Sequence, residues 1–264
     1  MKKKKVILSI SGHDPSGGAG LQTDILTSNF FNLHCVSSLT CQTVQTTKKL
    51  FKLDPTKVKF FKQNIDHIIK STNLSGIKIG VVPNKNIACE IIKIISSLKI
   101  PVVIDPILFA GGGGKFTNKK DLSFLRDSFY PHSSILTPNI EELKILSKNK
   151  SEEDSIKFLF DKGIKNIYVT GKVNKNKITN SLYSNGFLVK ETSSKYLKKN
   201  IHGTGCALST AILCNLVNEK SIEDSCSLSH KFLSHLVKNS TKTTGQDILD
   251  FKKWNPFMLS LQQA

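Results

Sequence analysis

Residues 202–206, with the sequence His-Gly-Thr-Gly-Cys, lie directly before an apolar segment with helical periodicity. Gly203 and Gly205 allow a tight turn, and no side chains shield their backbone N–H groups. The helix that follows directs the positive end of its dipole to the same place, which predicts an anion hole. Cys206 falls in the first helical turn, where the dipole lowers the pKa of a thiol and favours the thiolate. An anion hole beside a proton acceptor is what phosphoryl transfer to an alcohol requires.

The same motif also has a purely structural interpretation. Gly-x-Gly is common in turns, and a cysteine on a helix is more often a small core residue than a catalyst. The motif alone does not decide between the two, so the chemistry needs support from other positions in the chain.

A glycine-rich loop, residues 11–24, joins the first expected strand to the first expected helix. It lacks the Gly-Lys-Ser/Thr of a P-loop and a clean G-x-G-x-x-G, so a flexible connector is one interpretation. The other is the wall of a binding site. Asp24 lies in the first turns of the helix and could face the crevice, where a carboxylate binds an amine or a hydroxyl. Gly12 at the end of the strand would let a flat ring approach the backbone.

Polar residues follow two further buried strands. Asp105 ends the strand at 102–104, where it either caps the turn or acts near a metal or phosphate. Asn139 and Glu142 lie three residues apart at a helix start, and spacing alone favours a capping box. The alternative is that they hold water molecules of a Mg²⁺ bound to nucleotide phosphates, since Mg²⁺ keeps most of its water shell.

Short apolar strands alternate with amphipathic helices along the chain, and together they must position these residues. We expect strands at 6–11, 36–44, 77–82, 102–104, 135–136 and 167–170, and a hairpin of 178–183 and 187–191 around a Ser-Asn-Gly turn. We expect helices at 21–32, 58–70, 87–98, from 140 onward, 152–162, 206–217 and 222–237.

The alternation predicts an α/β fold, a three-layer sandwich with a mostly parallel sheet and helices on both faces. We interpret residues 1–264 as one domain, with a basic tail at 1–5 and a C-terminal segment at 240–264 to which no element is assigned. Ligands bind at the carboxyl ends of strands in such folds, and all the motifs above lie there.

Composition limits the classes of partner. The net charge is +18, yet only Arg126 among 38 basic residues is arginine, the usual reader of bases and phosphates, so we expect no nucleic-acid partner. The six cysteines show no C-x-x-C pair and indicate reduced thiols rather than disulfides or a zinc site. The apolar run at 6–10 is too short for a signal peptide, and no stretch is long enough for a membrane span. We expect a cytoplasmic protein with no membrane partner; a homodimer is a possible assembly.

Several motifs occur together and in a familiar order. They are Ser-Gly-x-Asp-Pro-Ser-Gly-Gly-Ala-Gly-Leu-Gln-x-Asp at 11–24, Val-Gln-x-Thr at 44–47, Lys-Ile-Gly at 78–80, Asp-Pro at 105–106, Leu-Thr-Pro-Asn at 136–139 with Glu142, and the motif at 202–206. With them the chain, from about Val6 to the second closing helix, resembles the hydroxymethylpyrimidine/phosphomethylpyrimidine kinases of thiamine biosynthesis, in the ribokinase-like superfamily.

The resemblance implies an activity and a role for each matching position. The activity is ATP-dependent phosphorylation of the hydroxymethyl aminopyrimidine and then of its monophosphate, which gives the diphosphate, with ATP and Mg²⁺ as cofactors. It implies that Asp24 and Gln45 bind the pyrimidine in a pocket lined by Gly12 and Val81. Gly203, Gly205 and the amide of Cys206 form the anion hole, and Cys206 is the general base. Asn139 and Glu142 support Mg·ATP without binding the metal directly, and Asp105 and Thr204 lie on the nucleotide side.

The chain departs from the pattern of the family at two positions. Thr170 stands where the family has a lysine that contacts ATP phosphates, unless Lys172 substitutes from a shifted backbone. Gly111 replaces a second lysine, and the glycine run at 111–114 is expected to form a mobile lid without a cation. The alternatives are a pyridoxine/pyridoxal kinase and a pyrimidine-binding homologue with weakened catalysis.

Overall fold

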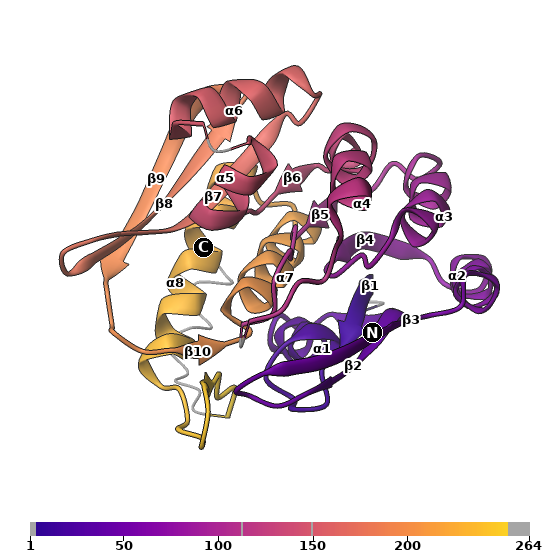
Figure 1. Cartoon of the computed structure of the whole chain (residues 1–264), viewed down its shortest axis with the longest axis horizontal. Coiled ribbons are helices and arrows are strands. Elements are labelled where there is room, and N and C mark those ends of the chain that lie inside the picture. The colour runs from indigo at the N-terminus through magenta and orange to yellow at the C-terminus, as the bar shows by residue number, and fades with distance from the viewer. Residues whose placement is uncertain (1–3, 112, 149, 253–264) are drawn as a thin grey trace.

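The computed structural model describes residues 4–111, 113–148 and 150–252. The strands of its main sheet are β1 (Val6–His13), β2 (His34–Gln45), β3 (Leu50–Pro55), β4 (Leu74–Ile79), β5 (Val102–Ile104), β6 (Ile135–Leu136), β7 (Asn166–Asn174), β8 (Lys177–Ser184) and β9 (Phe187–Lys195). Within the described residues these nine strands follow the order β3-β2-β1-β4-β5-β6-β7-β8-β9 (Figure 1).

The sheet is mostly parallel, as the sequence predicts. Strands β2, β1, β4, β5, β6 and β7 pair in parallel, and antiparallel strands complete both edges. At one edge β8 and β9 form the predicted hairpin, and β7 runs on to Asn174 because its end pairs with the start of β8. At the other edge lies β3, which the sequence did not predict: its residues are largely exposed and carry no clear alternation of apolar and polar side chains.

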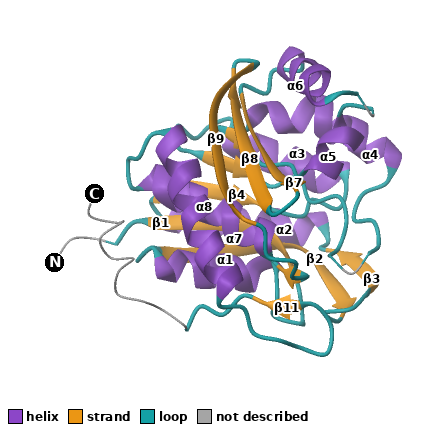
Figure 2. Cartoon of the chain, turned by 90° about the vertical axis from the view of Figure 1, so that its left-hand side faces the viewer, coloured by secondary structure: helices purple, strands orange, loops and turns teal. Residues whose placement is uncertain are grey.

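Helices cover both faces of the sheet, which confirms the three-layer α/β fold (Figure 2). One layer consists of α1 (Gly20–Phe30), α7 (Thr204–Val217) and α8 (Ile222–Lys238). The other consists of α2 (Val58–Ser71), α3 (Lys85–Ile95), α4 (Lys119–Phe124), α5 (Ile140–Leu146) and α6 (Glu152–Asp161). A π-helical turn (Leu125–Phe129) and a 3₁₀ turn (Tyr130–His132) follow α4; these and α4 were not predicted.

Two apolar cores lie between these layers. Consecutive residues of β1 point to opposite faces, so Ile7 packs in the core under α7 and α8, and Leu8 packs in the core under α2 and α3. Each such buried side chain contributes about 1.5–3 kcal/mol of burial free energy. The central strands are therefore largely apolar on both faces, although a few polar side chains, such as Ser9 of β1 and Lys78 of β4, are buried within them.

A small second sheet holds the start of α7. Strands β10 (Ile201–His202) and β11 (Asp247–Ile248) pair in parallel, so the C-terminal segment is tied to the residues just before the anion-hole motif. The remainder of the segment predicted at 240–264, from 253 on, lies outside the described residues, as do residues 1–3 of the basic tail.

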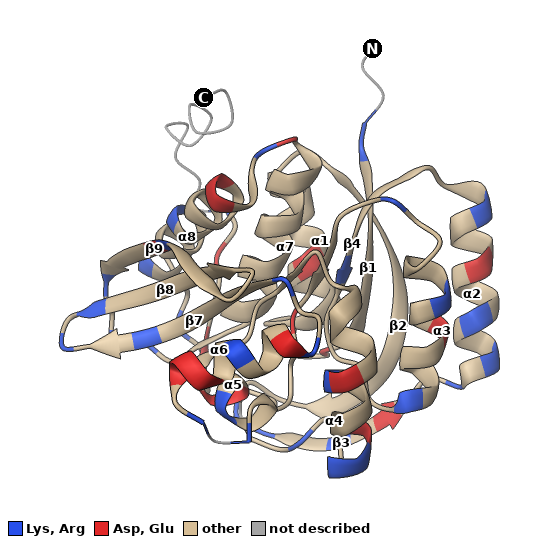
Figure 3. Cartoon of the chain, turned by 90° about the horizontal axis from the view of Figure 1, so that it is seen from above, with Lys and Arg blue, Asp and Glu red and all other residues tan. Residues whose placement is uncertain are grey.

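Charge is spread over the molecule rather than gathered on one element. Lysines and the single arginine occur on the helices, on the β7–β9 strands and in loops, with acidic residues between them (Figure 3). In the described part of the chain, no helix is long and apolar enough to cross a membrane.

Candidate active site

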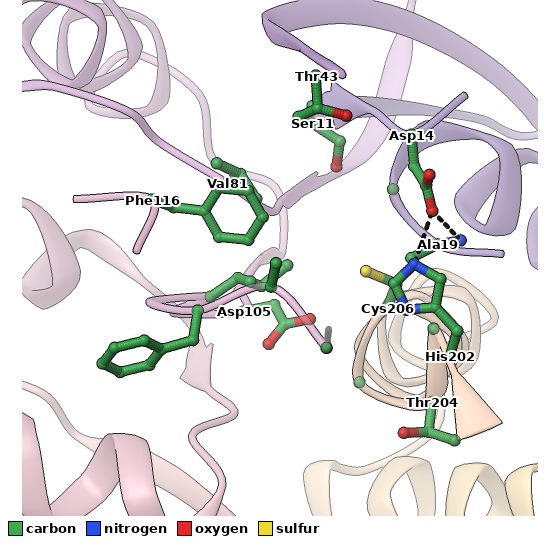
Figure 4. A pocket seen from close by; sticks show the side chains of 18 of the residues that line it. Ser11, Asp14, Ala19, Thr43, Val81, Asp105, Phe116, His202, Thr204 and Cys206 are labelled. Carbon is green, nitrogen blue, oxygen red and sulfur yellow. Dashed lines mark hydrogen bonds and ion pairs between the residues drawn. The ribbon is translucent and has the colours of Figure 1, made fainter. Parts of the chain in front are cut away.

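A cavity of about 210 Å³ lies at the carboxyl ends of the parallel strands, as predicted. The segments that follow β1, β4, β5 and β6 form its walls, and the start of α7 forms one end (Figure 4). The following predicted site residues line it: Gly12, Gln45, Val81, Asp105, Asn139, Glu142, Gly203, Thr204, Gly205 and Cys206. Asp24, the remaining predicted residue, is not in the wall.

The first turn of α7 forms the end of the cavity. Gly203 is the N-cap residue, has a φ of 79°, and gives the helix no side-chain cap. A Cβ at Gly203 would collide with the carbonyl oxygen of Gly18, so both the conformation and the close approach require glycine. The amides of the first helical turn therefore face the cavity without a capping side chain, which is the geometry of an anion site.

Asp14 organises the glycine-rich loop, so this loop is not a loose connector. Its carboxylate accepts hydrogen bonds from the amides of Ser16 and Ala19, both at 2.9 Å, and from the Ser16 hydroxyl at 2.7 Å. Its Oδ2 also lies 2.8 Å from Nε2 of His202, a contact drawn in Figure 4. Although burial opposes it, these contacts lower the pKa of Asp14 to about 2.

Neither Asp14 nor His202 was assigned a role from the sequence. The Asp-Pro-Ser-Gly spacing is typical of a side chain that closes its own turn, and this signal could have identified Asp14. Nothing in the sequence indicates that it pairs with His202, because the contact joins segments that lie far apart in the chain.

The prediction that Asp24 faces the crevice is wrong. Its side chain has no exposed surface, and its carboxylate lies behind the wall of the cavity. It accepts hydrogen bonds from hydroxyls at 2.6–2.8 Å and from Lys78 Nζ at 3.0 Å; the hydroxyls are those of Ser9, Ser11 and Thr210. The buried lysine on β4 draws Asp24 inward, because a buried ammonium requires a charged partner.

The prediction that the helix dipole makes Cys206 a thiolate is also wrong. Cys206 is only 5% exposed, and burial raises the pKa of its thiol to about 12. The carboxyl groups of Asp24 and Asp105 add to this rise, whereas Lys78 and the amide of Gly20 oppose it. Desolvation therefore outweighs the dipole, and the group directed into the cavity is a neutral thiol.

Two buried carboxyl groups, those of Asp105 and Glu142, line the same cavity as the thiol. Burial raises the pKa of Asp105 to about 6, although Lys78 and a hydrogen bond from Ser209 lower it. Burial and the proximity of Asp105 raise the pKa of Glu142 further. Because Lys78 and the Ser209 hydroxyl act on Asp105, it is the first of the two to ionise as the pH rises.

The structure confirms the capping interpretation of Asn139 and Glu142. The Asn139 side chain accepts from the Glu142 amide at 2.9 Å, and the Glu142 carboxylate accepts from the Asn139 amide at 3.0 Å. The other Glu142 oxygen accepts from the amide of Leu108 at 3.3 Å. Both residues also line the cavity, so capping does not remove them from the site.

Apolar side chains form the cavity wall opposite α7. Val81 and Phe116 present branched and flat surfaces to the cavity (Figure 4). Phe109 and Cys41 also line it. A Cβ at Gly12 would lie 2.9 Å from the Cys41 sulfur, so glycine widens the space here. The sequence predicted Val81 and Gly12 but not the two phenylalanines, which lie in a loop without periodicity.

A second cavity of about 640 Å³ adjoins the first. It lies between the β7–β9 strands and α8, and the two cavities share Thr170, Ile201, Thr204 and Gly205. Its wall is mainly apolar, with Lys195, Lys199 and Lys238 at its border. The uncapped start of α7 therefore lies between two cavities and can contact ligands in both.

The positions that depart from the family pattern lie around this junction. Thr170 lines both cavities, whereas Lys172 lines a neighbouring groove with Asn139 and Glu142. Lys172 Nζ pairs with the Glu152 carboxylate at 2.8 Å and is half exposed. Gly111 lies over the first cavity beside His202, and the adjoining Gly112 of the predicted lid lies outside the described residues.

The side chains that line the cavity suit a hydrated Mg²⁺ rather than one bound by protein ligands alone. Among the described residues, no group of three His, Cys, Asp or Glu side chains is arranged to bind a metal ion. Both Glu142 oxygens already accept hydrogen bonds from amides, so an all-protein metal site does not fit. Two buried, mutually repelling carboxyl groups do fit a hydrated cation carried on phosphates.

The chain is similar to known kinases. The sequence profile of a family described as phosphomethylpyrimidine kinase matches residues 14–249. A hydroxymethylpyrimidine/phosphomethylpyrimidine kinase of Aquifex aeolicus (strain VF5) is 30% identical over 254 residues, which cover 93% of this chain and 100% of the relative. One of Bacillus subtilis (strain 168) is 26% identical over 245 residues, which cover 88% of this chain and 89% of the relative.

A solved structure shares the fold. The pyridoxal kinase of Staphylococcus aureus, in complex with pyridoxal, matches with a TM-score of 0.86 at 22% identity and covers 96% of both chains. The same enzyme in complex with ADP gives a TM-score of 0.86. With its profile match over most of the chain and its relatives of full length, this chain belongs to the phosphomethylpyrimidine kinase family.

Proposed function

We propose that this protein transfers the γ-phosphoryl group of ATP to the hydroxymethyl group of the aminopyrimidine precursor of thiamine, and then a second one to the monophosphate. The observation that carries the proposal is the position of the uncapped α7 N-terminus between two cavities of different size. One cavity fits a small aromatic alcohol, the other a nucleotide, and the helix end stabilises the phosphoryl group that passes between them.

The smaller cavity has the features of an aromatic acceptor site. Val81, Phe109 and Phe116 offer apolar contact to a flat ring, and Gln45 offers an amide that can pair with ring nitrogen and amino groups. Because Asp24 is behind the wall, Gln45 and Thr43 are the polar side chains of β2 that we expect to recognise the ring.

The larger cavity is the expected nucleotide site. Its apolar wall between β8 and α8 suits a purine and ribose, while Thr204 and Gly205 direct the phosphates to the helix start. When bound, Mg²⁺ supplies positive charge to the phosphates. Asn139 and Glu142 would hold its water molecules, and Asp105 would act beside the phosphates.

The hydroxyl proton leaves through Cys206 and Asp105. The neutral Cys206 thiol cannot take a proton unless it gives one up. As the substrate oxygen bonds to phosphorus, its proton moves to Sγ, and the thiol proton moves to the ionised Asp105 carboxylate. The number of protons is unchanged, and the negative charge needed for the transfer resides on Asp105 rather than on a resting thiolate.

The test is incubation of the purified protein with ATP, Mg²⁺ and the aminopyrimidine alcohol, with product masses recorded over time. We expect the monophosphate first and the diphosphate afterwards. A parallel incubation with pyridoxal, the ligand named for the Staphylococcus aureus enzyme, tests the alternative. Turnover of pyridoxal without turnover of the pyrimidine would overturn the proposal, and binding of the pyrimidine without any product would indicate a homologue that has lost catalysis.

A further inference from the structure

Lys78 is a buried charge that the mechanism above does not use. It lies on β4 in the middle of the sheet, and its side chain has no exposed surface. Its Nζ donates to the Asp24 carboxylate at 3.0 Å and to the Ser11 hydroxyl oxygen at 3.2 Å. Because Ser11 lines the smaller cavity, the ammonium lies one hydrogen bond behind the cavity wall.

Backbone pairing places Lys78 next to Asp105. In the parallel pair of β4 and β5, Lys78 lies opposite Val103, and the Asp105 amide donates to the carbonyl of Ile79 at 2.8 Å. A side chain near the end of β4 and one just after β5 are therefore neighbours at the same edge of the sheet.

Helix α7 contacts the carboxylates of both Asp105 and Asp24. Adjacent residues of one turn hold them: the Ser209 hydroxyl donates to Asp105 at 3.2 Å, and the Thr210 hydroxyl donates to Asp24 at 2.8 Å. Lys78, Asp24 and Asp105 consequently form one buried cluster held by α1, α7 and the sheet, in which Asp105 lines the cavity and the other two lie behind its wall.

The groups that face Asp105 differ in charge. Four of these groups are acids: Asp24 from α1, Glu142 from α5, the hydroxyl of Tyr130 and the thiol of Cys206. Lys78 is the cation that acts on Asp105. No lysine or arginine is among the described residues that line the smaller cavity. Although burial lowers the pKa of Lys78, the surrounding acids raise it above its ordinary value, so the ammonium stays charged.

We propose that Lys78 is a positioning residue for phosphoryl transfer, whose buried ammonium keeps Asp105 ionised and ready to receive the hydroxyl proton. Asp24 holds Lys78 in place and offsets part of its charge. The role in turnover rests on the proposed function, whereas the effect on Asp105 is measurable in the protein without substrate.

The first measurement is the titration midpoint of Asp105, followed by carboxyl-carbon NMR in the full chain without nucleotide and assigned with Asp105→Asn. Lys78→Met keeps the length of the side chain and removes its charge. We expect the midpoint to move up by about one to three pH units. Asp24→Asn, which removes the opposing anion, moves it down. The double variant Lys78→Met/Asp24→Asn removes both members of the buried Lys78–Asp24 pair and still gives a reading if a single variant does not fold.

The second measurement is the pH profile of kcat with the aminopyrimidine alcohol. Proton uptake by Asp105 defines the acid limb, so we expect Lys78→Met to move that limb to higher pH while KM for ATP stays unchanged. Lys62→Met is the matched control, because Lys62 pairs with Asp66 at 2.6 Å on the exposed face of α2. A lysine with a merely structural role would lower thermal stability and leave both midpoints in place.

The outcomes separate the two proposals. A folded Lys78→Met with an unchanged Asp105 midpoint overturns the inference. A moved midpoint in a protein that does not phosphorylate the pyrimidine overturns the proposed function and supports the electrostatic role of Lys78. If the titration midpoint of Asp105 and the acid limb of the kcat profile both move, the result supports both the electrostatic role of Lys78 and the proposed function.

Discussion

Asp14 and His202 pair at 2.8 Å, although they belong to the loop after β1 and to the strand before α7. Their contact joins the glycine-rich loop to the anion hole, since Gly18 in that loop also packs against the ring of His202. The two loops that frame the cavity therefore behave as one unit, and a change at either residue is transmitted to the helix end.

Asp14→Asn tests this unit through stability. The pKa of Asp14 is lowered from 3.8 to about 2, so its stabilising contribution is complete above about pH 4 and disappears as the pH falls towards 2. Urea unfolding across this range should show a fall in the free energy of unfolding that is smaller in Asp14→Asn. Equal slopes in the two proteins would show that the contacts of the Asp14 carboxylate do not contribute to stability.

Cys206→Ala tests the proton path. We expect kcat to fall by about 10²–10⁴-fold, because the thiol that relays the proton is lost, while KM for the pyrimidine changes little. Asp105→Asn should lower kcat similarly. A cysteine needed only for packing would instead cost thermal stability and leave the activity per folded molecule intact.

Gly203→Ala and Gly205→Ala form a matched pair of substitutions in the anion hole. At Gly203 the positive φ and the Gly18 carbonyl exclude a side chain, whereas a Cβ at Gly205 would lie 3.5 Å from Asp105, an ordinary contact. Gly203→Ala should therefore lower Tm and abolish turnover, and Gly205→Ala should retain the wild-type Tm. A wild-type Tm for Gly203→Ala would refute the required left-handed turn.

Thr170→Lys tests the missing cation. Thr170 lines both cavities, and a lysine there gains a charge-assisted contact to ATP phosphates of roughly 1.5–3 kcal/mol, or about one to two decades in rate. We expect kcat/KM for ATP to rise. Lys172→Ala should change kcat/KM little, because Lys172 is paired with Glu152. A large loss in Lys172→Ala would show that Lys172 has taken over the role.

The sequence predicted those parts of the fold that depend on local pattern. The apolar strands, the amphipathic α2 and α3, and the turn at Gly203 follow from residues close together in the chain. Strand β3 was missed because it forms only by pairing with β2, and α4 because its six residues are too few to show a helical period, although Leu122 and Phe124 pack against the core.

The site was predicted less completely, for the same reason. The motif residues at the strand ends line the cavity, as predicted. Asp24 does not, because its position depends on Lys78, which is far away in the chain. The charge of Cys206 was predicted wrongly because the dipole is visible in the sequence whereas burial is not. The Asp14–His202 pair is equally a product of the folded state.

The pairing of β10 with β11 has a consequence for synthesis on the ribosome. The nine strands of the sheet are complete once residue 195 has been added, but His202 is held by a strand that is formed only by residues 247–248. Gln246, next to that strand, also donates to Asn200 at 2.7 Å. The growing chain thus contains the last strand of its main sheet before it contains the residues that hold the start of α7, so the anion hole has to wait for residues 247–248.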